Sequence, residues 1–185
     1  MVADDKVLVR RCLEGDTASF ALLIDEYQRP LFNVALRMVN NYEDARDITQ
    51  TAFVRAYEKL STYDSKYRFF SWIYRILINE SLNLLQRRKQ REARDGAILD
   101  HGSISRPKTP EEVYEGNRWS DRIQTALMEL SPDYRSVIVC KHFLSLSYKE
   151  MSQVLDIPEK TVKSRLFTAR RLLCESLVKR GVART

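Results

Sequence analysis

Residues 145–173 constrain the fold of this chain more than any other segment. Apolar residues recur there at steps of three and four, first over 148–155 and again over 162–173, a spacing typical of two amphipathic helices. Between them, Pro158 suits the first turn of a helix because its missing N–H breaks no hydrogen bond there. The pattern predicts two helices that meet at a tight turn.

The second of these helices has a basic, hydroxyl-rich outer face. From Glu159 onward the chain holds eight Lys or Arg residues and two Glu residues. The segment fits either a helix-turn-helix that reads the DNA major groove or an ordinary helical hairpin with a solvated basic face. The excess of positive charge favours DNA. The side chains expected to look outward are Lys160, Thr161, Lys163, Ser164, Phe167 and Thr168, with packing inward as the alternative for Phe167.

The rest of the chain is expected to be helical too. Among 185 residues there are only five Gly and five Pro, and alternating apolar strands bounded by turn residues are absent. The net charge of +6 favours a polyanionic partner. Three scattered Cys and two His argue against a zinc site and indicate reduced thiols. No apolar run approaches the ~20 residues of a membrane helix, and no signal peptide is recognisable, so a cytoplasmic protein is expected.

Three helices are predicted before residue 60. The first ends at Gly15, and the second follows the helical period over 20–38, with Pro30 expected to kink or divide it. Asn41 can cap the third. The polar face of that helix mixes acids with an amide, which suits a protein partner better than DNA, although a merely solvated face is the alternative. This face comprises Asp44, Arg46, Asp47, Gln50, Thr51 and Arg55.

A long helix is predicted from about residue 69 to residue 91, ending in the basic run QRRKQREAR. Cations suit a helix C-terminus for dipole reasons alone. Aromatic residues beside a basic helix end also suit single-stranded nucleic acid, with rings for bases and cations for phosphates. Both interpretations of this helix stay open on its composition.

Periodicity is lost over residues 95–110, which hold two Gly and two Pro and include His101. This length is long for a connection within one compact domain, so a flexible linker is predicted there. A new helix is expected to begin at Thr109-Pro110. The predicted fold class is therefore all-α, with an N-terminal helical bundle over 1–94 and a four-helix domain over 111–185.

Four blocks together resemble the ECF-type sigma factors of the bacterial sigma-70 family. They are FALLIDEYQRPLFNVALRMVNN from Phe20, DARDITQTAFVRAYEKL from Asp44, YRFFSWIYRILINESLNLLQRRKQR from Tyr67, and the segment from Leu130 to Leu173. The resemblance covers nearly the whole chain, with the blocks in the family's order. It implies a non-catalytic subunit of RNA polymerase that reads and melts the −10 promoter element and reads the −35 element.

The resemblance also implies three groups of site residues. Docking on the clamp helices of the polymerase's largest subunit falls to Asp44, Asp47, Gln50, Thr51 and Arg55. Contacts with −10 DNA fall to Tyr63, Asp64, Lys66, Asn79, Asn83, Arg87, Arg88 and Lys89. Contacts with −35 DNA fall to Lys160, Thr161, Lys163, Ser164, Arg165, Phe167, Thr168 and Arg171.

The chain departs from the family pattern at three positions in the C-terminal segment. Asp156 and Ser145 stand where glycine is common, and Thr168 is shorter than the Arg or Glu often found there. Asp tolerates the left-handed backbone conformation better than most residues, so the turn at Asp156 is expected to form.

Further partners and competing functions follow from the same residues. The resemblance implies an anti-sigma factor as inhibitor. A polymerase-independent helix-turn-helix regulator is the alternative, and it predicts sequence-specific DNA binding without polymerase. The chain has no phosphate-binding GxxxxGK[ST] loop, no HExxH, no GxSxG and no Cys/His cluster with ligand spacing. We therefore expect no enzymatic activity, no cofactor, no metal, no membrane insertion and no small-molecule substrate.

Overall fold

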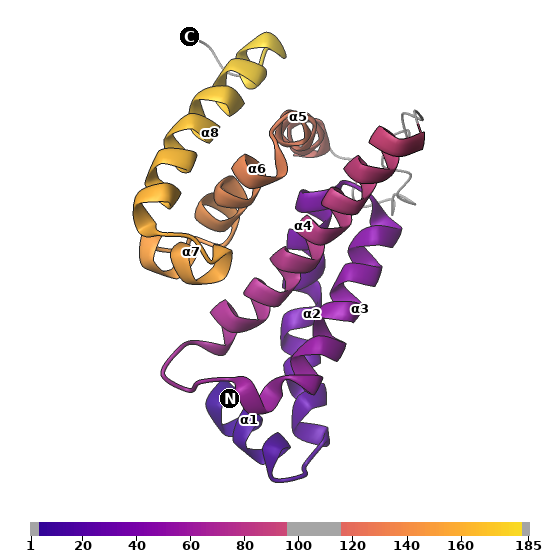
Figure 1. Ribbon diagram of the computed structural model, residues 1–185, viewed down its shortest axis with the longest axis vertical. Helices are drawn as coiled ribbons and strands as arrows, with labels where there is room; N and C mark the ends of the chain where they lie inside the picture. Colours follow the sequence, from indigo (N-terminus) through magenta and orange to yellow (C-terminus); the bar gives the residue numbers. More distant parts are fainter. Residues whose placement is uncertain (1–3, 96–115, 183–185) are drawn as a thin grey trace.

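The computed structural model describes residues 4–95 and 116–182, and every regular element in these two ranges is helical (Figure 1). The N-terminal range contains α1 (Asp5–Leu13), α2 (Ala18–Val39), α3 (Tyr42–Glu58), the short 3-10 turn η1 (Leu60–Thr62) and α4 (Phe69–Asp95). The C-terminal range contains α5 (Gly116–Met128), α6 (Pro132–Ile138), the π-helical turn η3 (Val139–Phe143), α7 (Tyr148–Leu155) and α8 (Glu159–Lys179). The all-α prediction is confirmed.

Local sequence signals explain where the first helices begin and end. Gly15 follows α1 with a φ of 102°, a left-handed conformation that glycine adopts without steric cost. The Asn41 side chain accepts a hydrogen bond of 3.0 Å from the Asp44 backbone N–H and so caps α3 as predicted. Pro30 does not divide its helix, because α2 runs from Ala18 to Val39 with Pro30 inside.

Helices α2, α3 and α4 pack around one apolar core, and α1 covers the start of α2. The Tyr27 hydroxyl donates to Asp5 at 2.7 Å and ties α1 to α2. Burial, followed by this bond to a carboxylate, raises the pKa of Tyr27, so the phenol stays a neutral donor. This three-helix bundle supports the segments expected to meet polymerase and the −10 element.

Arg135 organises the C-terminal helices. Its side chain is buried, and it donates to the backbone carbonyls of Leu127 at 3.0 Å and of Met128 and Leu130 at 3.1 Å each. The carbonyls of Leu127 and Met128 belong to the last turn of α5, where helical donors run out, and that of Leu130 follows the helix. The Leu127 carbonyl also accepts from the Leu130 backbone N–H at 3.1 Å. Burial lowers the pKa of Arg135 to about 10. One arginine from α6 therefore closes the end of α5.

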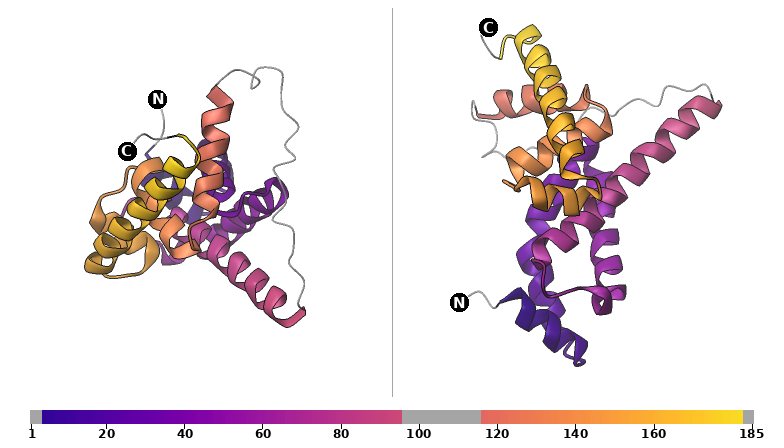
Figure 2. Two further views of the ribbon diagram at one scale, coloured as in Figure 1. Left: turned by 90° about the horizontal axis from the view of Figure 1, so that it is seen from above. Right: turned by 60° about the vertical axis from the view of Figure 1, so that its left-hand side comes forward.

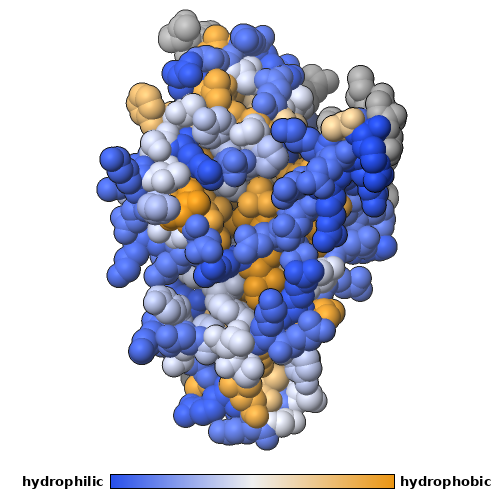
Figure 3. All heavy atoms as spheres, in the orientation of Figure 1, coloured by the Kyte–Doolittle hydropathy of each residue, from blue (hydrophilic) through white to orange (hydrophobic). Residues whose placement is uncertain are grey.

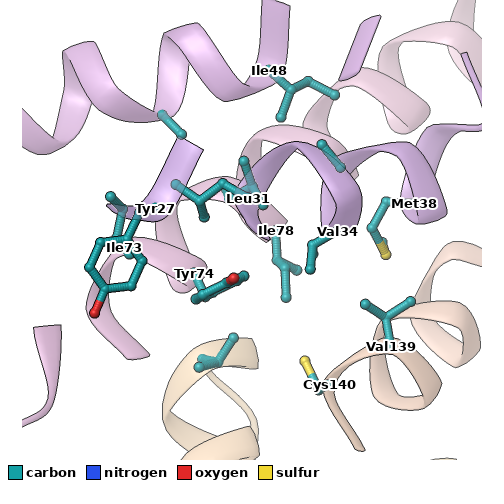
Figure 4. Close-up of a cluster of buried hydrophobic side chains, with 14 of the residues drawn as sticks. Tyr27, Leu31, Val34, Met38, Ile48, Ile73, Tyr74, Ile78, Val139 and Cys140 are labelled. Carbon is teal, nitrogen blue, oxygen red and sulfur yellow. The ribbon is translucent and has the colours of Figure 1, made fainter. Parts of the chain in front are cut away.

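The two groups of helices share a continuous core. Figure 4 shows Val139 and Cys140 of η3 facing Val34 and Met38 of α2, and burial raises the pKa of the Cys140 thiol to about 12. Arg135 also donates to the Met38 carbonyl across the junction. Figure 3 shows apolar residues gathered along the middle of this face, with hydrophilic residues around them. The two domains thus pack against each other through α2 and α4 on one side and α5 to α7 on the other.

Several predictions fall on residues that the structure does not describe. Apart from Asp95, which ends α4, the linker over 95–110 lies outside the described ranges, and so do the helix start at Thr109-Pro110 and His101. Among the described helices, none is long and apolar enough to cross a membrane.

Candidate promoter and polymerase interface

Helix α8 turns its apolar stripe inward and its polar residues outward. Val162, Leu166 and Ala169 are buried in the C-terminal core, which sets the rotation of the helix. Phe167 is 75% exposed, so of its two predicted placements the outward one is observed. The side chains on the exposed face are Lys160, Lys163, Ser164, Phe167, Arg170 and Arg171, while Thr161, Arg165 and Thr168 are half-buried at its edges. The exposed face of α8 is therefore basic and carries few acids, as expected for a helix that meets DNA.

Some cationic side chains of α8 form ion pairs within the protein, and others do not. Arg165 lies 3.3 Å from Asp133 of α6, and Arg171 lies 2.7 Å from Glu175 one turn along α8. Lys160 and Lys163 are in no ion pair with any residue of the described ranges; Lys163 lies 5.4 Å from the ring of Tyr148. The two lysines are therefore the cations most readily offered to phosphate.

Arg170 belongs to this face although the sequence did not single it out. It is exposed, and its Nε donates to Nε2 of His142 at 3.3 Å. It lies three positions after Phe167, and residues three apart share a helix face. That spacing, applied to Phe167, would have found it.

The turn before α8 has the conformation that the sequence predicts. Asp156 ends α7 with a φ of 55°, and Ser145 precedes α7 with a φ of 54°, both in the left-handed region. A reciprocal capping box starts α7: Ser147 accepts from the Glu150 backbone N–H, and Glu150 accepts from Ser147 N at 2.9 Å. The bonds from Ser147, followed by the charge of Arg68, lower the pKa of Glu150.

The segment predicted to read the −10 element begins with a loop held on aromatic rings. The Tyr63 ring lies 5.7 Å from Phe69 and 5.5 Å from Trp72, and its hydroxyl donates to the Tyr67 carbonyl at 2.6 Å. Asp64 accepts from the Lys66 backbone N–H at 2.9 Å. Tyr63 thus anchors the loop, while Asp64 and Lys66 stay exposed.

A cleft of about 490 Å³ opens beside this loop, between the start of α4 and the end of α7. Its lining includes Tyr63, Asp64, Tyr67 and Trp72 on one side and Asp156 on the other. Asn79 does not line the cleft. It lies further along α4, in an exposed stripe with Arg75 and Asn83 at successive steps of four. Of the predicted −10 contacts, Tyr63 therefore lines the cleft, and Asn79 lies on the adjoining exposed surface of α4.

The C-terminal half of α4 projects beyond the other helices of the described ranges (Figure 2). Arg87 and Lys89 are exposed there, as phosphate contacts require. Arg88 is placed differently, because it forms an ion pair of 2.6 Å with Asp44 of α3. Arg88 therefore joins α4 to α3 in this structure.

The polar face of α3 is narrower than the sequence indicates. Asp47 and Gln50 are exposed and Thr51 is half-buried, but Asp44 faces Arg88, and Arg55 pairs with Glu80 of α4. Two of the five predicted docking residues thus have partners inside the bundle. The outward face gains Val54, which is 57% exposed and lies one turn after Gln50. An apolar residue is normally assigned to the core, so the sequence offered no reason to place Val54 on the outward face.

No group of three or more His, Cys, Asp or Glu side chains in the described ranges could hold a metal ion. The described surfaces include the basic exposed face of α8, the aromatic and basic residues of α4 with its preceding loop, and the outward face of α3. Binding of macromolecules is the chemistry that these surfaces support.

Two family models match the chain in the order of its domains. Sigma-70 region 2 matches residues 23–91, and Sigma-70 region 4 matches residues 120–173. The ECF RNA polymerase sigma factor SigW of Bacillus subtilis is 30% identical over 179 residues, covering 93% of this chain and 96% of that protein. The ECF RNA polymerase sigma-E factor of Escherichia coli K12 is 31% identical over 173 residues, covering 90% of each chain.

Solved structures show the same fold at lower identity. CnrH, in complex with the cytosolic domain of CnrY, matches with a TM-score of 0.67 and 24% identity over 95% of this chain and 97% of that one. RpoE of Bartonella quintana, in complex with the anti-sigma factor NepR, matches with a TM-score of 0.71 and 22% identity over 85% and 96%. The relatives span both domains and the family models match each in turn: the chain belongs to the ECF sigma factors of the sigma-70 family.

Proposed function

We propose that this protein directs promoter-specific transcription initiation as a dissociable subunit of bacterial RNA polymerase, using α4 and its preceding loop for the −10 element and α8 for the −35 element. The observation that carries this function is the pairing, in one chain, of a groove-reading face on α8 with an aromatic-basic surface on α4. A regulator that binds DNA alone needs only the first. Reading two promoter elements makes binding of the second effectively intramolecular.

Docking on polymerase falls to the outward face of α3. Asp47 and Gln50 offer acceptors and donors there, and Val54 offers apolar area one turn after Gln50. The Asp47 carboxylate on this face disfavours DNA as its partner, since phosphates would repel it. The partner we propose is the clamp-helix segment of the polymerase's largest subunit.

Replacing Asp47 and Gln50 with arginine is expected to weaken binding to core polymerase about tenfold or more, because complementary charge becomes repulsive. Fluorescence titration of labelled protein with core polymerase measures this affinity. The circular dichroism spectrum should not change, since both side chains are exposed.

Arg55 offers the matched comparison on the same helix. Arg55→Gln removes the ion pair with Glu80 inside the bundle rather than a contact of the outward face. It should lower the stability of the bundle only slightly, as expected for the loss of a partly exposed ion pair. Polymerase affinity should stay within about twofold of the wild type. If Arg55→Gln abolished docking and the double arginine variant did not, the proposed face would be wrong.

An inhibitory partner is part of the proposal. CnrH and RpoE were solved with the cytosolic domain of CnrY and with the anti-sigma factor NepR. We propose that an anti-sigma factor likewise binds this protein and blocks it from polymerase. The protein would act in the cytoplasm and without catalysis. Its effect on transcription would depend on how much of it is not bound to the anti-sigma factor.

A further inference from the structure

Two arginines of the N-terminal domain, in α4 and its preceding loop, form ion pairs with acids of the C-terminal domain. The Arg75 guanidinium of α4 lies 2.9 Å from the Asp156 carboxylate in the turn after α7. Arg68, just before α4, lies 3.6 Å from the Glu150 carboxylate of α7. Both pairs join α4 and its preceding loop to α7, and Arg75 and Asp156 line the cleft beside Tyr63.

Arg75 stands where a DNA strand would pass. It begins the exposed stripe that continues through Asn79 and Asn83, and it lines the cleft together with the aromatic rings of Tyr67 and Trp72. Rings with adjoining cations form the surface that a single strand needs, since bases stack on the rings and phosphates meet the cations. The position of Arg75 therefore fits a phosphate contact as well as a contact between domains.

The two acids are placed in a specific way. Asp156 holds a φ of 55°, a conformation in which glycine would be unstrained, yet the residue there carries a carboxylate that reaches Arg75. Glu150 is oriented by two bonds from Ser147, and its lowered pKa keeps it charged. Each arginine thus meets carboxylate oxygens as it would meet phosphate oxygens.

We propose that Arg68 and Arg75 bind phosphates of the melted −10 strand, and that Asp156 and Glu150 occupy these arginines in the free protein. The inference rests on the proposed function and adds an internal competitor to it. While the domains are packed together, these two arginines of the −10 surface are occupied by the protein's own acids. Docking on polymerase, which must hold the domains at the spacing of two promoter elements, would release both arginines at once.

We call the two ion pairs, Arg75–Asp156 and Arg68–Glu150, the latch. The latch must be weak to be reversible, and the exposure of its side chains to water keeps it weak. The side chains of Arg75 and Asp156 are 45% and 73% exposed. Exposed pairs of this kind change an equilibrium by a factor of about 1.4 to 5 each. The two pairs together therefore add a factor of about two to twenty-five in favour of the closed state, beyond the apolar contacts and the Arg135–Met38 bond at the domain junction.

Binding of a short fluorescein-labelled single-stranded DNA of mixed sequence to the free, full-length protein tests both parts of the proposal: that the arginines bind DNA and that the acids compete for them. The double variant Asp156→Asn with Glu150→Gln is expected to bind about two- to twenty-fivefold more tightly than the wild type. Asn keeps the left-handed turn, and Gln keeps the capping box, so both replacements preserve the local fold. The matched control is Glu43→Gln, which makes one such charge change in a pair with Arg46 inside α3 and should shift affinity less than twofold.

Arg75→Gln separates a DNA contact from a mere latch. If Arg75 acted only as a latch, its loss would tighten DNA binding as the loss of Asp156 does. We expect instead weaker binding than in the double variant, and a slope of log affinity against log salt that is smaller by about 0.7, the value for one lost single-strand phosphate contact. Tighter binding by Arg75→Gln than by the wild type would overturn its assignment to DNA.

Energy transfer between dyes reports whether the domains separate. Cys174 on α8 is exposed, whereas Cys12 and Cys140 are buried with raised pKa values, so dyes can be directed to Cys174 and to a Glu58→Cys substitution at the end of α3. The acid double variant and Arg75→Gln should both lower the transfer efficiency. If the acid double variant matched the wild type in transfer and in DNA affinity, the latch would be rejected. Promoter-dependent transcription by the wild type in that case would leave the proposed function intact, whereas its absence would reject the function itself.

Discussion

Replacing Arg135 with alanine is expected to lower the free energy of unfolding by about 2–4 kcal/mol. The guanidinium donates to carbonyls of Leu127, Met128 and Leu130 and, across the domain junction, of Met38. Alanine removes the side-chain donor from the carbonyls of Met38, Met128 and Leu130, at a cost of about 1–3 kcal/mol for each fully buried one, while Leu127 still accepts from the Leu130 backbone N–H. Relief of the buried charge, visible in the pKa lowered to about 10, offsets part of the loss.

Urea unfolding followed by circular dichroism measures this change. Arg165→Ala is the matched control, because it removes an arginine of the same domain whose 3.3 Å pair with Asp133 is partly exposed, and it should cost no more than about 1 kcal/mol. Arg135→Lys should behave more like alanine than like arginine, since an ammonium group cannot reach several diverging carbonyls in the way a planar fork can. Arg135→Ala and Arg165→Ala variants of equal stability would contradict this assignment.

Replacing both Tyr63 and Asn79 with alanine is expected to slow open-complex formation by about a hundredfold, with polymerase affinity unchanged. Stacking on an aromatic ring contributes about 1–3 kcal/mol per base, and an exposed amide can both donate to and accept from a base edge. Taking a base out of the stack costs a few kcal/mol, so losses of this size decide whether melting succeeds. Permanganate footprinting of the melted region and fluorescence titration with core polymerase measure the two effects separately.

The structure supplies the control for Tyr63, because its ring also anchors the loop on Phe69 and Trp72. Tyr63→Phe keeps the ring and loses only the bond from the hydroxyl to the Tyr67 carbonyl. It should keep at least a third of the wild-type rate, whereas Tyr63→Ala should lose most of it. Equal loss of polymerase binding and of melting in the double alanine variant would reject the role of this surface in the −10 element.

The helices and the turn before α8 were predictable because local chemistry decides them. Asn41 caps α3, Gly15 ends α1, and Asp156 adopts the left-handed conformation expected of an Asp in place of glycine. Apolar periodicity also oriented α8, since its buried stripe leaves the lysines outward whatever the partner domain does. Of the two outcomes expected at Pro30, a kink or a division of the helix, division does not occur, because tertiary packing on both sides of the proline outweighs one lost hydrogen bond.

Pairings between distant residues were not predictable from helical spacing. Helical spacing alone places Asp44 and Arg55 on the same face of α3 as Asp47. In the structure, however, Asp44 pairs with Arg88 of α4 and Arg55 pairs with Glu80 of α4. The packing of the two domains also depends on contacts between residues about a hundred positions apart, such as Arg135 with Met38. Apolar spacing records which face of a helix is buried, and not which helix covers it.

Run-off transcription with core RNA polymerase tests the central claim most directly. Fragments of the source genome are transcribed by core polymerase with and without this protein, and gel shifts on the same fragments are run without polymerase. We predict discrete promoter-dependent transcripts only when the protein is added, and weak, sequence-independent binding by the protein alone. Sequence-specific gel shifts without polymerase, with no transcript from any fragment, would contradict this account and favour a polymerase-independent helix-turn-helix regulator.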